Sequence, residues 1–452
     1  MPTPADRTVA LTVSMLIGCI CYAGKASVFA LHAITLTLFL LYLWNVRSLQ
    51  KAIVGVIQQK VSTQATLFMI FAAYASLSAL WATVPSEAVS AGISLVASIL
   101  ACHILLALFA RLPVQTLVLI GGWQLVGFTL GFAFLWYELK YGYRVTMWFA
   151  NTFLGADFDL GSMAFHNKGG KLYYIKHHTA NWGVATANVL LWPMVAIAGL
   201  VLSGNIRKFA MVTMVVLVGI LTYTSDHQTS QIGFPIAAAL VTLAHFHARR
   251  VVMLLIVGCA SLFAFIVPAA QFAFHTLDLD RASWVHPSLQ ARFIIWGVTA
   301  DHVPDAPIIG IGAKSTRQWG EQNNVPTVKE EGRAYALTTD AHAHNNYLQI
   351  WFELGAIGAA LLAAAAISLL NGISKLHPDV APFAVGMAVI VLTISFVSWS
   401  VWNSWLSAIY ALGIACVHHA NKIASADAST GARASFARIW LPVRRARDAT
   451  VS

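Results

Sequence analysis

Hydrogen-bonding and titratable side chains gather where a polar segment meets an apolar one, in "DAHAHNNYLQIWFELGAIG" (residues 340–358). If a helix begins near Asn345, His344 lies beside the free N–H groups and the positive end of the helix dipole. Both disfavour the imidazolium, so the ring should be neutral and able to accept a proton from a hydroxyl. From the spacing alone, the alternative is that His344 and Asn345 only cap the helix.

The same predicted helix carries a carboxylate and two glycines. A carboxylate more than a turn into an apolar helix must face a partner or water, so we expect Glu353 to pair with a basic or interfacial polar group and to support the site. Gly355 and Gly358 are interpreted as small residues that let helices approach closely in a membrane.

A second candidate is the arginine in "QARFIIWG" (residues 290–297). Arg292 and Trp296 are four residues apart, so they share one face of a helix. A guanidinium held at a membrane surface suits an anionic headgroup or a pyrophosphate. The alternative is an arginine that only extends its charged end into water.

Two further polar segments precede apolar runs. "TSDHQTSQIG" (224–233) is too polar for a simple turn, and its His227 should face a cavity mouth. "KLYYIKHHTANWG" (171–183) places Lys176 and His178 in a cationic patch, which indicates either an anionic partner or a solvated loop face. The sequence has no HExxH or GxxxxGK[ST] pattern, and its cysteines lie in apolar runs, so we expect no metal, nucleotide or cofactor.

The composition requires lipid around these segments. Of 452 residues, 58% are hydrophobic and 10% are charged, whereas soluble domains carry about 25% charged residues. The net charge of +10 is concentrated in short loops and the C-terminal tail, which indicates orientation in a membrane instead of nucleic-acid binding.

Apolar runs of about 20 residues predict membrane-spanning helices. The predicted fold is an all-α polytopic membrane protein with about twelve transmembrane helices and a folded loop domain before the tenth. Because only "SWSVWNSW" separates the last two runs, eleven spans with a broken final helix is the alternative. The runs are 8–24, 27–45, 62–82, 88–110, 115–137, 181–202, 209–224, 232–247, 251–270, 345–370, 380–398 and 400–418.

The loops predict the organisation. Lysines and arginines of the short loops fall on one side, which places both termini in the cytoplasm, with Lys25 as the exception. The predicted parts are nine transmembrane helices in 1–270 with an outer loop at 138–180, a cap domain in 271–344, three helices in 345–420, and a basic tail in 421–452 that we expect to be disordered.

The sequence resembles the O-antigen ligase and O-antigen polymerase family of bacterial inner-membrane proteins. The resemblance rests on the spacing of His344, Asn345, Gly355 and Gly358, on Arg292 followed by "PIIGIGAKS", and on one large outer loop before the histidine helix. It covers about residues 200–350, and the ligase-type members fit "LQIWFELGAIG" better than the polymerases do.

The resemblance implies a metal-independent, inverting glycosyltransferase with a periplasmic active site. The donor would be a glycan on undecaprenyl pyrophosphate, and the acceptor a hydroxyl of lipid A–core. His344 would be the general base and Arg292 would hold the pyrophosphate, with Asn345 and His342 in support. The cap arginines Arg281, Arg317 and Arg333 would add contacts.

One departure concerns the second cation. Members of the family often carry Ser-Arg in the short outer loop, where this chain has "SDHQTS". A protonated His227, Arg281, Lys176 or His178 would have to substitute. The alternatives for function are a polymerase with the same donor, protein glycosylation, or a transporter, although no internal repeat indicates the last.

Overall fold

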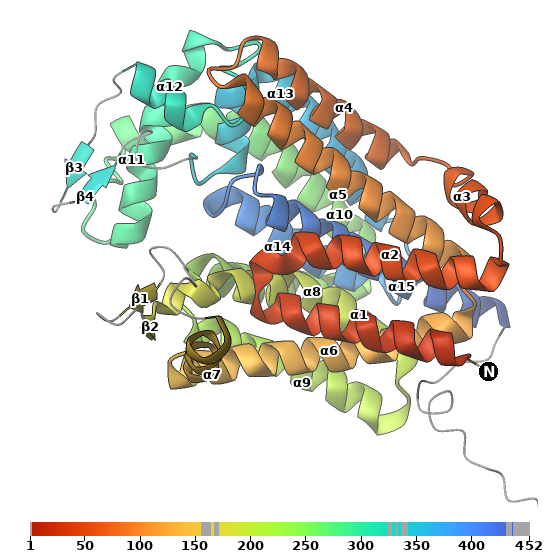
Figure 1. Ribbon diagram of the computed structural model, residues 1–452. Helices are drawn as coiled ribbons and strands as arrows, with labels where there is room; N and C mark the ends of the chain where they lie inside the picture. The colour runs from red at the N-terminus through yellow and green to blue at the C-terminus, as the bar shows by residue number, and fades with distance from the viewer. Residues whose placement is uncertain are drawn as a thin grey trace, which may run out of the picture.

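The computed structural model describes residues 2–154, 164–166, 171–323, 328–330, 333–335, 342–430 and 436. These residues form a bundle of long helices (Figure 1), which confirms the predicted all-α fold class. The bundle consists of α1 (Pro4–Tyr22), α2 (Ser27–Val46), α4 (Thr63–Leu77), α5 (Pro85–Arg111), α6 (Val114–Tyr141), α8 (Asn181–Val201), α9 (Gly204–Thr224), α10 (Gln228–His275), α13 (Asn346–Ile373), α14 (Ala381–Val397) and α15 (Ser404–Thr430).

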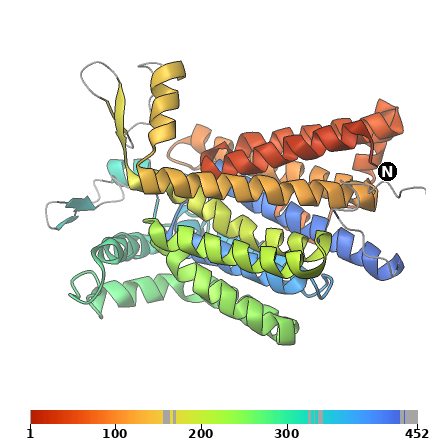
Figure 2. The same ribbon diagram turned by 90° about the horizontal axis from the view of Figure 1, so that it is seen from below.

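Smaller elements lie at the two ends of the bundle. One end carries most of them, and we call it the cap end (Figure 1). The antiparallel pair of β1 (Ala164–His166) and β2 (Leu172–Ile175) projects from this end in the turned view as well (Figure 2). The N-terminus and α3 (Leu49–Ile57) lie at the opposite end. The elements of the cap end are α7 (Arg144–Phe149), α11 (Pro287–His302), α12 (Thr316–Gln322), and the antiparallel pairs β1 (Ala164–His166) with β2 (Leu172–Ile175) and β3 (Val328–Glu330) with β4 (Arg333–Tyr335).

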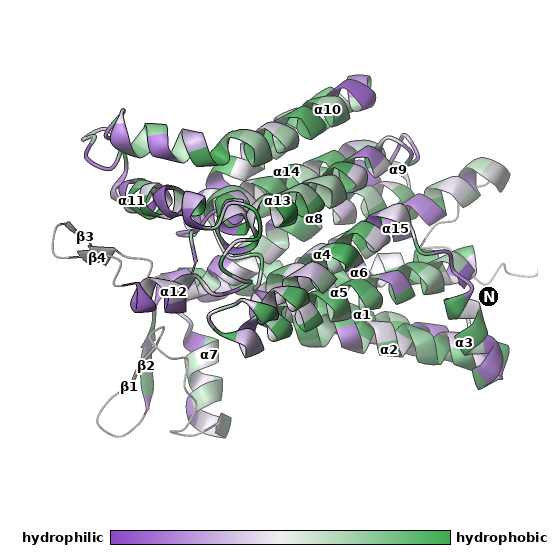
Figure 3. Ribbon diagram, turned by 90° about the horizontal axis from the view of Figure 1, so that it is seen from above, coloured by the Kyte–Doolittle hydropathy of each residue, from purple (hydrophilic) through white to green (hydrophobic). Residues whose placement is uncertain are grey.

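The helices have the length and composition of membrane spans. Nine helices among the described residues are long and apolar enough to cross a membrane, and α14 is a shorter apolar helix. Hydrophobic residues colour the helices along most of their length, whereas hydrophilic residues gather towards the ends (Figure 3). The chain is therefore a multi-span membrane protein, and the exact number of crossings and their orientation remain predictions.

Most of the predicted runs correspond to helices with bounds shifted by a few residues. Two of the runs, 232–247 and 251–270, lie in the 48-residue α10, which leaves helical geometry at His247. The last two runs form the separate helices α14 and α15, joined by residues 398–403. The helix α15 continues through Thr430, beyond the predicted start of the tail at residue 421, because no glycine or proline interrupts the chain before Gly431.

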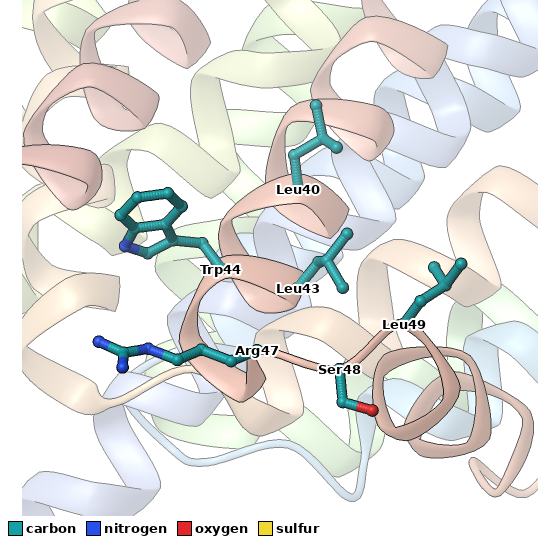
Figure 4. A pocket seen from close by; sticks show the side chains of 6 residues that line it. All are labelled: Leu40, Leu43, Trp44, Arg47, Ser48 and Leu49. Atoms are coloured by element: carbon teal, nitrogen blue, oxygen red, sulfur yellow. The ribbon is translucent and has the colours of Figure 1, made fainter.

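The interior of the bundle is built around α8. Nearly all side chains of this helix are buried, and it contacts α6, α9, α14 and α15. The corner between α2 and α3 forms a shallow cavity of about 430 Å³ lined by Leu40, Leu43, Trp44, Arg47, Ser48 and Leu49 (Figure 4). This cavity lies at the end of the bundle remote from the cap end, so it is separate from the residues described next.

Candidate functional site

His344 immediately precedes the cap of α13. Its φ of 51° is in the left-handed region, which non-glycine residues seldom adopt and which is often found at functional sites. The ring Nδ1 lies 3.1 Å from the backbone carbonyl oxygen of Ser398. A carbonyl only accepts, so Nδ1 carries the hydrogen and Nε2 is the acceptor of the neutral ring. The packing thus selects the tautomer that a general base requires.

The neighbours predicted to support His344 lie against it. His342 accepts a hydrogen bond from the His344 backbone N–H at 3.0 Å, and the two ring centroids are 4.1 Å apart. Asn345 is the N-cap of α13 and accepts from the Leu348 N–H at 3.1 Å, as the position before a helix favours. Capping and a catalytic position for His344 are therefore compatible here.

The helix α13 breaks at Gly355. Its φ of 62° and ψ of −163° are accessible to glycine almost alone. The segment 307–312 pairs with the break: Ile311 and Gly312 donate to the carbonyls of Phe352 and Glu353 at 3.2 and 2.8 Å. In return, the N–H groups of residues 356 and 357 donate to the carbonyls of residues 307 and 308 at 2.9 and 3.2 Å. Gly355 thus docks the cap segment, and its interpretation as a helix–helix contact was wrong.

Glu353 is fully buried beside this break. Its carboxylate accepts from the Lys314 N–H at 2.9 Å, from the amide of Gln349 at 3.1 Å, and from both the N–H and the hydroxyl of Thr316. The indole N–H of Trp402 is a further donor. The partners are therefore polar groups, which is one of the two arrangements predicted for this residue.

Arg292 lies on α11, which covers the cap end of α10 and α13. Trp296 on the same face is buried and packs on Phe396 at the end of α14, with ring centroids 5.5 Å apart. The guanidinium donates to the Ser288 hydroxyl at 3.3 Å, and no carboxylate among the described residues pairs with it. Burial lowers the pKa of Arg292. A cation that is partly desolvated and lacks a counter-charge in this part of the chain favours an anionic ligand.

His227 is buried in the short loop between α9 and α10. Its ring stacks on Trp399 at a centroid distance of 4.8 Å, and Nδ1 lies 2.7 Å from the Ser230 hydroxyl. Burial and the nearby positive charge of Arg292 lower the pKa of His227 to about 3. The ring is therefore neutral at ordinary pH, which argues against a protonated His227 as the second cation.

Four other predicted ligands lie on the surface. Arg281 is exposed and pairs with Asp280 at 3.5 Å, and Arg317 is exposed and pairs with Glu321 at 3.3 Å. The Lys176 ammonium lies 5.3 Å from the centre of the Phe165 ring, and His178 is exposed. The structure does not gather these four around a common centre, and the Arg333 side chain lies outside the described residues.

The segment 398–403 was not predicted as part of the site. The stretch "SWSVWNSW" indicated only a break between two apolar runs. In the structure this segment supplies the Ser398 carbonyl for His344, the Trp399 ring for His227 and the Trp402 indole for Glu353. The available signal was the density of tryptophan and serine at the predicted end of a span.

Comparisons with known proteins point to one family. A family described as O-antigen ligase matches residues 209–363, which include His227, Arg292 and His344. A protein of Rickettsia conorii named "Putative polysaccharide ligase" is 26% identical over 231 residues, or 49% of this chain and 53% of that protein. Proteins of the same name from Rickettsia typhi and Rickettsia felis are 25% identical over 236 residues and 27% identical over 229 residues, which cover 51% and 49% of this chain and 56% and 54% of those proteins. The chain spans about half the length of the curated relatives it matches.

Proposed function

We propose that the chain, which matches the O-antigen ligase family over residues 209–363, transfers a polysaccharide from undecaprenyl pyrophosphate to a hydroxyl of lipid A–core. The reaction takes place at the periplasmic face of the inner membrane, where we place the cap end. The relatives' name supports a polysaccharide ligase, and the apolar bundle supports substrates that are themselves anchored in the membrane.

The observation that carries the proposal is the hydrogen bond between His344 Nδ1 and the Ser398 carbonyl. This bond places the ring hydrogen on Nδ1, so the lone pair on Nε2 can act as the general base. The acceptor hydroxyl gives its proton to Nε2 while its oxygen forms a bond to the anomeric carbon. The bond from that carbon to the pyrophosphate breaks, and the electron pair leaves with undecaprenyl pyrophosphate. A single displacement of this kind inverts the anomeric carbon.

Arg292 stabilises the leaving pyrophosphate in this proposal. Negative charge grows on the departing phosphate oxygens, and a guanidinium already held in a partly dehydrated setting interacts with that charge more strongly than one in water. The neutral His227 lies near the Arg292 charge and offers a hydrogen-bonding group instead of a second cation.

The test is complementation of a deletion strain with the native chain, with His344→Ala and with His302→Ala. His302 is a matched control because it also lies at the cap end, where it pairs with Asp305 at 2.9 Å. Lipopolysaccharide is resolved on gels, lipid-linked glycans are extracted, and protein levels are compared by immunoblotting. We expect His344→Ala to leave bare lipid A–core and to accumulate long undecaprenyl-linked chains, whereas His302→Ala restores the native ladder.

Other outcomes would change the assignment. Lipid A–core that carries single repeats in the deletion strain would indicate a polymerase. An unchanged ladder in that strain would mean that the chain serves a different acceptor. Full activity of His344→Ala would refute its role as the base.

A further inference from the structure

Glu353 connects three segments that meet only in the folded chain. It belongs to α13, nine residues beyond His344. Its donors Lys314 and Thr316 belong to the segment that follows α11, and its donor Trp402 belongs to the segment 398–403. The segment with Lys314 and Thr316 continues the chain beyond the helix that carries Arg292. The segment 398–403 contacts His344. The side-chain amide of Gln349, on the same helix as Glu353, is a further donor.

The path from this carboxylate to the imidazole is short. The Trp402 indole N–H donates to Glu353, and the Trp402 backbone N–H donates to the Ser400 hydroxyl at 3.3 Å. The turn is closed by the Asn403 N–H, which donates to the Ser400 carbonyl at 3.1 Å. Ser398 at the start of this turn accepts from His344 Nδ1 at 3.1 Å. The orientation of the imidazole thus depends on a segment whose other end is held by Glu353.

A buried carboxylate is costly unless its oxygens are satisfied, and here both oxygens accept hydrogen bonds. An apolar residue would fill the same space without this cost. The arrangement is explained if the carboxylate has to hold several segments in one relative position, because only an acceptor with two oxygens can bond to all of them.

We propose that Glu353 is a positioning residue, which holds the Ser398 carbonyl in place through Trp402 and so keeps His344 in the tautomer and orientation needed for proton transfer. Glu353 itself does not touch the substrate. This inference rests on the proposed function of His344. A loosened imidazole should slow turnover more than it weakens donor binding, because misplacement of a reacting group by about 1 Å can cost on the order of 100-fold in rate.

The decisive variant is Trp402→Phe. It removes one donor from Glu353 and keeps an aromatic ring that can stack on Phe71, where the ring centroids are 6.1 Å apart. Trp192→Phe is the matched control, because Trp192 is also buried and its indole N–H has no partner among the described residues. Glu353→Ala and Glu353→Gln complete the series, since the amide of glutamine retains one acceptor oxygen.

Turnover and KM are measured on full-length protein in detergent, with an undecaprenyl-pyrophosphate-linked glycan as donor and rough lipopolysaccharide as acceptor. We expect Trp402→Phe to lower kcat about tenfold with KM for the donor nearly unchanged. Glu353→Gln should retain more activity than Glu353→Ala, and Trp192→Phe should match the native protein. Equal kcat for Trp402→Phe and Trp192→Phe would overturn the proposal.

A second measurement separates this proposal from the proposed function. Protein labelled with ¹⁵N in its histidines is compared by NMR in the native form, in Trp402→Phe and in His344→Gln, which identifies the His344 signals. We expect a single Nδ1–H tautomer in the native protein and a mixture in Trp402→Phe. If the tautomer shifts although the native protein transfers no glycan, the positioning role stands and the function fails. An unchanged tautomer in Trp402→Phe refutes the positioning role whatever the activity.

Discussion

Replacement of Gly355 by alanine tests how the cap segment is held on the bundle. A Cβ at this position would lie 2.4 Å from the carbonyl carbon and oxygen of Ile308. Both are backbone atoms, so the segment 307–312 would have to move. The residue also has a positive φ with an extended ψ, which alanine adopts only with strain.

The expected cost has two parts. Backbone strain of this kind is about 1–3 kcal/mol. The displaced segment would lose or weaken the two hydrogen bonds that the N–H groups of residues 356 and 357 make to it, each with a net value of about 1 kcal/mol. The total is about 3–5 kcal/mol, which for a chain of this length corresponds to a fall in Tm of roughly 3–5 °C.

The assay is thermal unfolding of purified Gly355→Ala in detergent, together with hydrogen exchange over residues 307–316. Gly258→Ala is the matched control, because Gly258 also lies in a long apolar helix and a Cβ there would meet nothing within 4 Å. Alanine should leave the control unchanged or slightly more stable. If Gly355→Ala unfolds at the same temperature as Gly258→Ala and the segment is equally protected, the docking argument is refuted.

Further predictions concern the charged and titratable groups of the cap end. Arg292→Ala should reduce the rate of transfer more than tenfold, since its charge is partly buried, whereas Arg281→Ala and Arg317→Ala should change it less than about twofold, because both cations are exposed and pair with neighbouring carboxylates. Equal losses for all three in the same transfer assay would argue against a special role for Arg292. Because the pKa of His227 is about 3 in the folded protein and near 6.5 when unfolded, the folded state binds fewer protons between these values. Stability should therefore fall with decreasing pH below about 6.5, by up to about 1.4 kcal/mol per pH unit. His227→Gln should flatten this dependence of Tm between pH 4 and 6, and an unchanged slope would contradict a neutral, buried His227.

Local sequence determined the helices of this protein. Each apolar run became a helix or part of one, because the length of an apolar run is a property of neighbouring residues. Asn345 could be predicted as a cap for the same reason, since a cap bonds to N–H groups two or three residues away. His344 and Arg292 could be selected because their types are unusual beside apolar runs.

Only the tertiary structure decided how these residues act on one another. The Ser398 carbonyl is 54 residues from His344, and Trp402 is 49 residues from Glu353. Gly355 breaks its helix because a segment about 45 residues earlier supplies the backbone partners that the break requires. The neutral state of His227 likewise follows from burial against Trp399 and from the charge on α11. No local pattern encodes contacts across such separations, whereas hydrophobic length and capping act within a few residues.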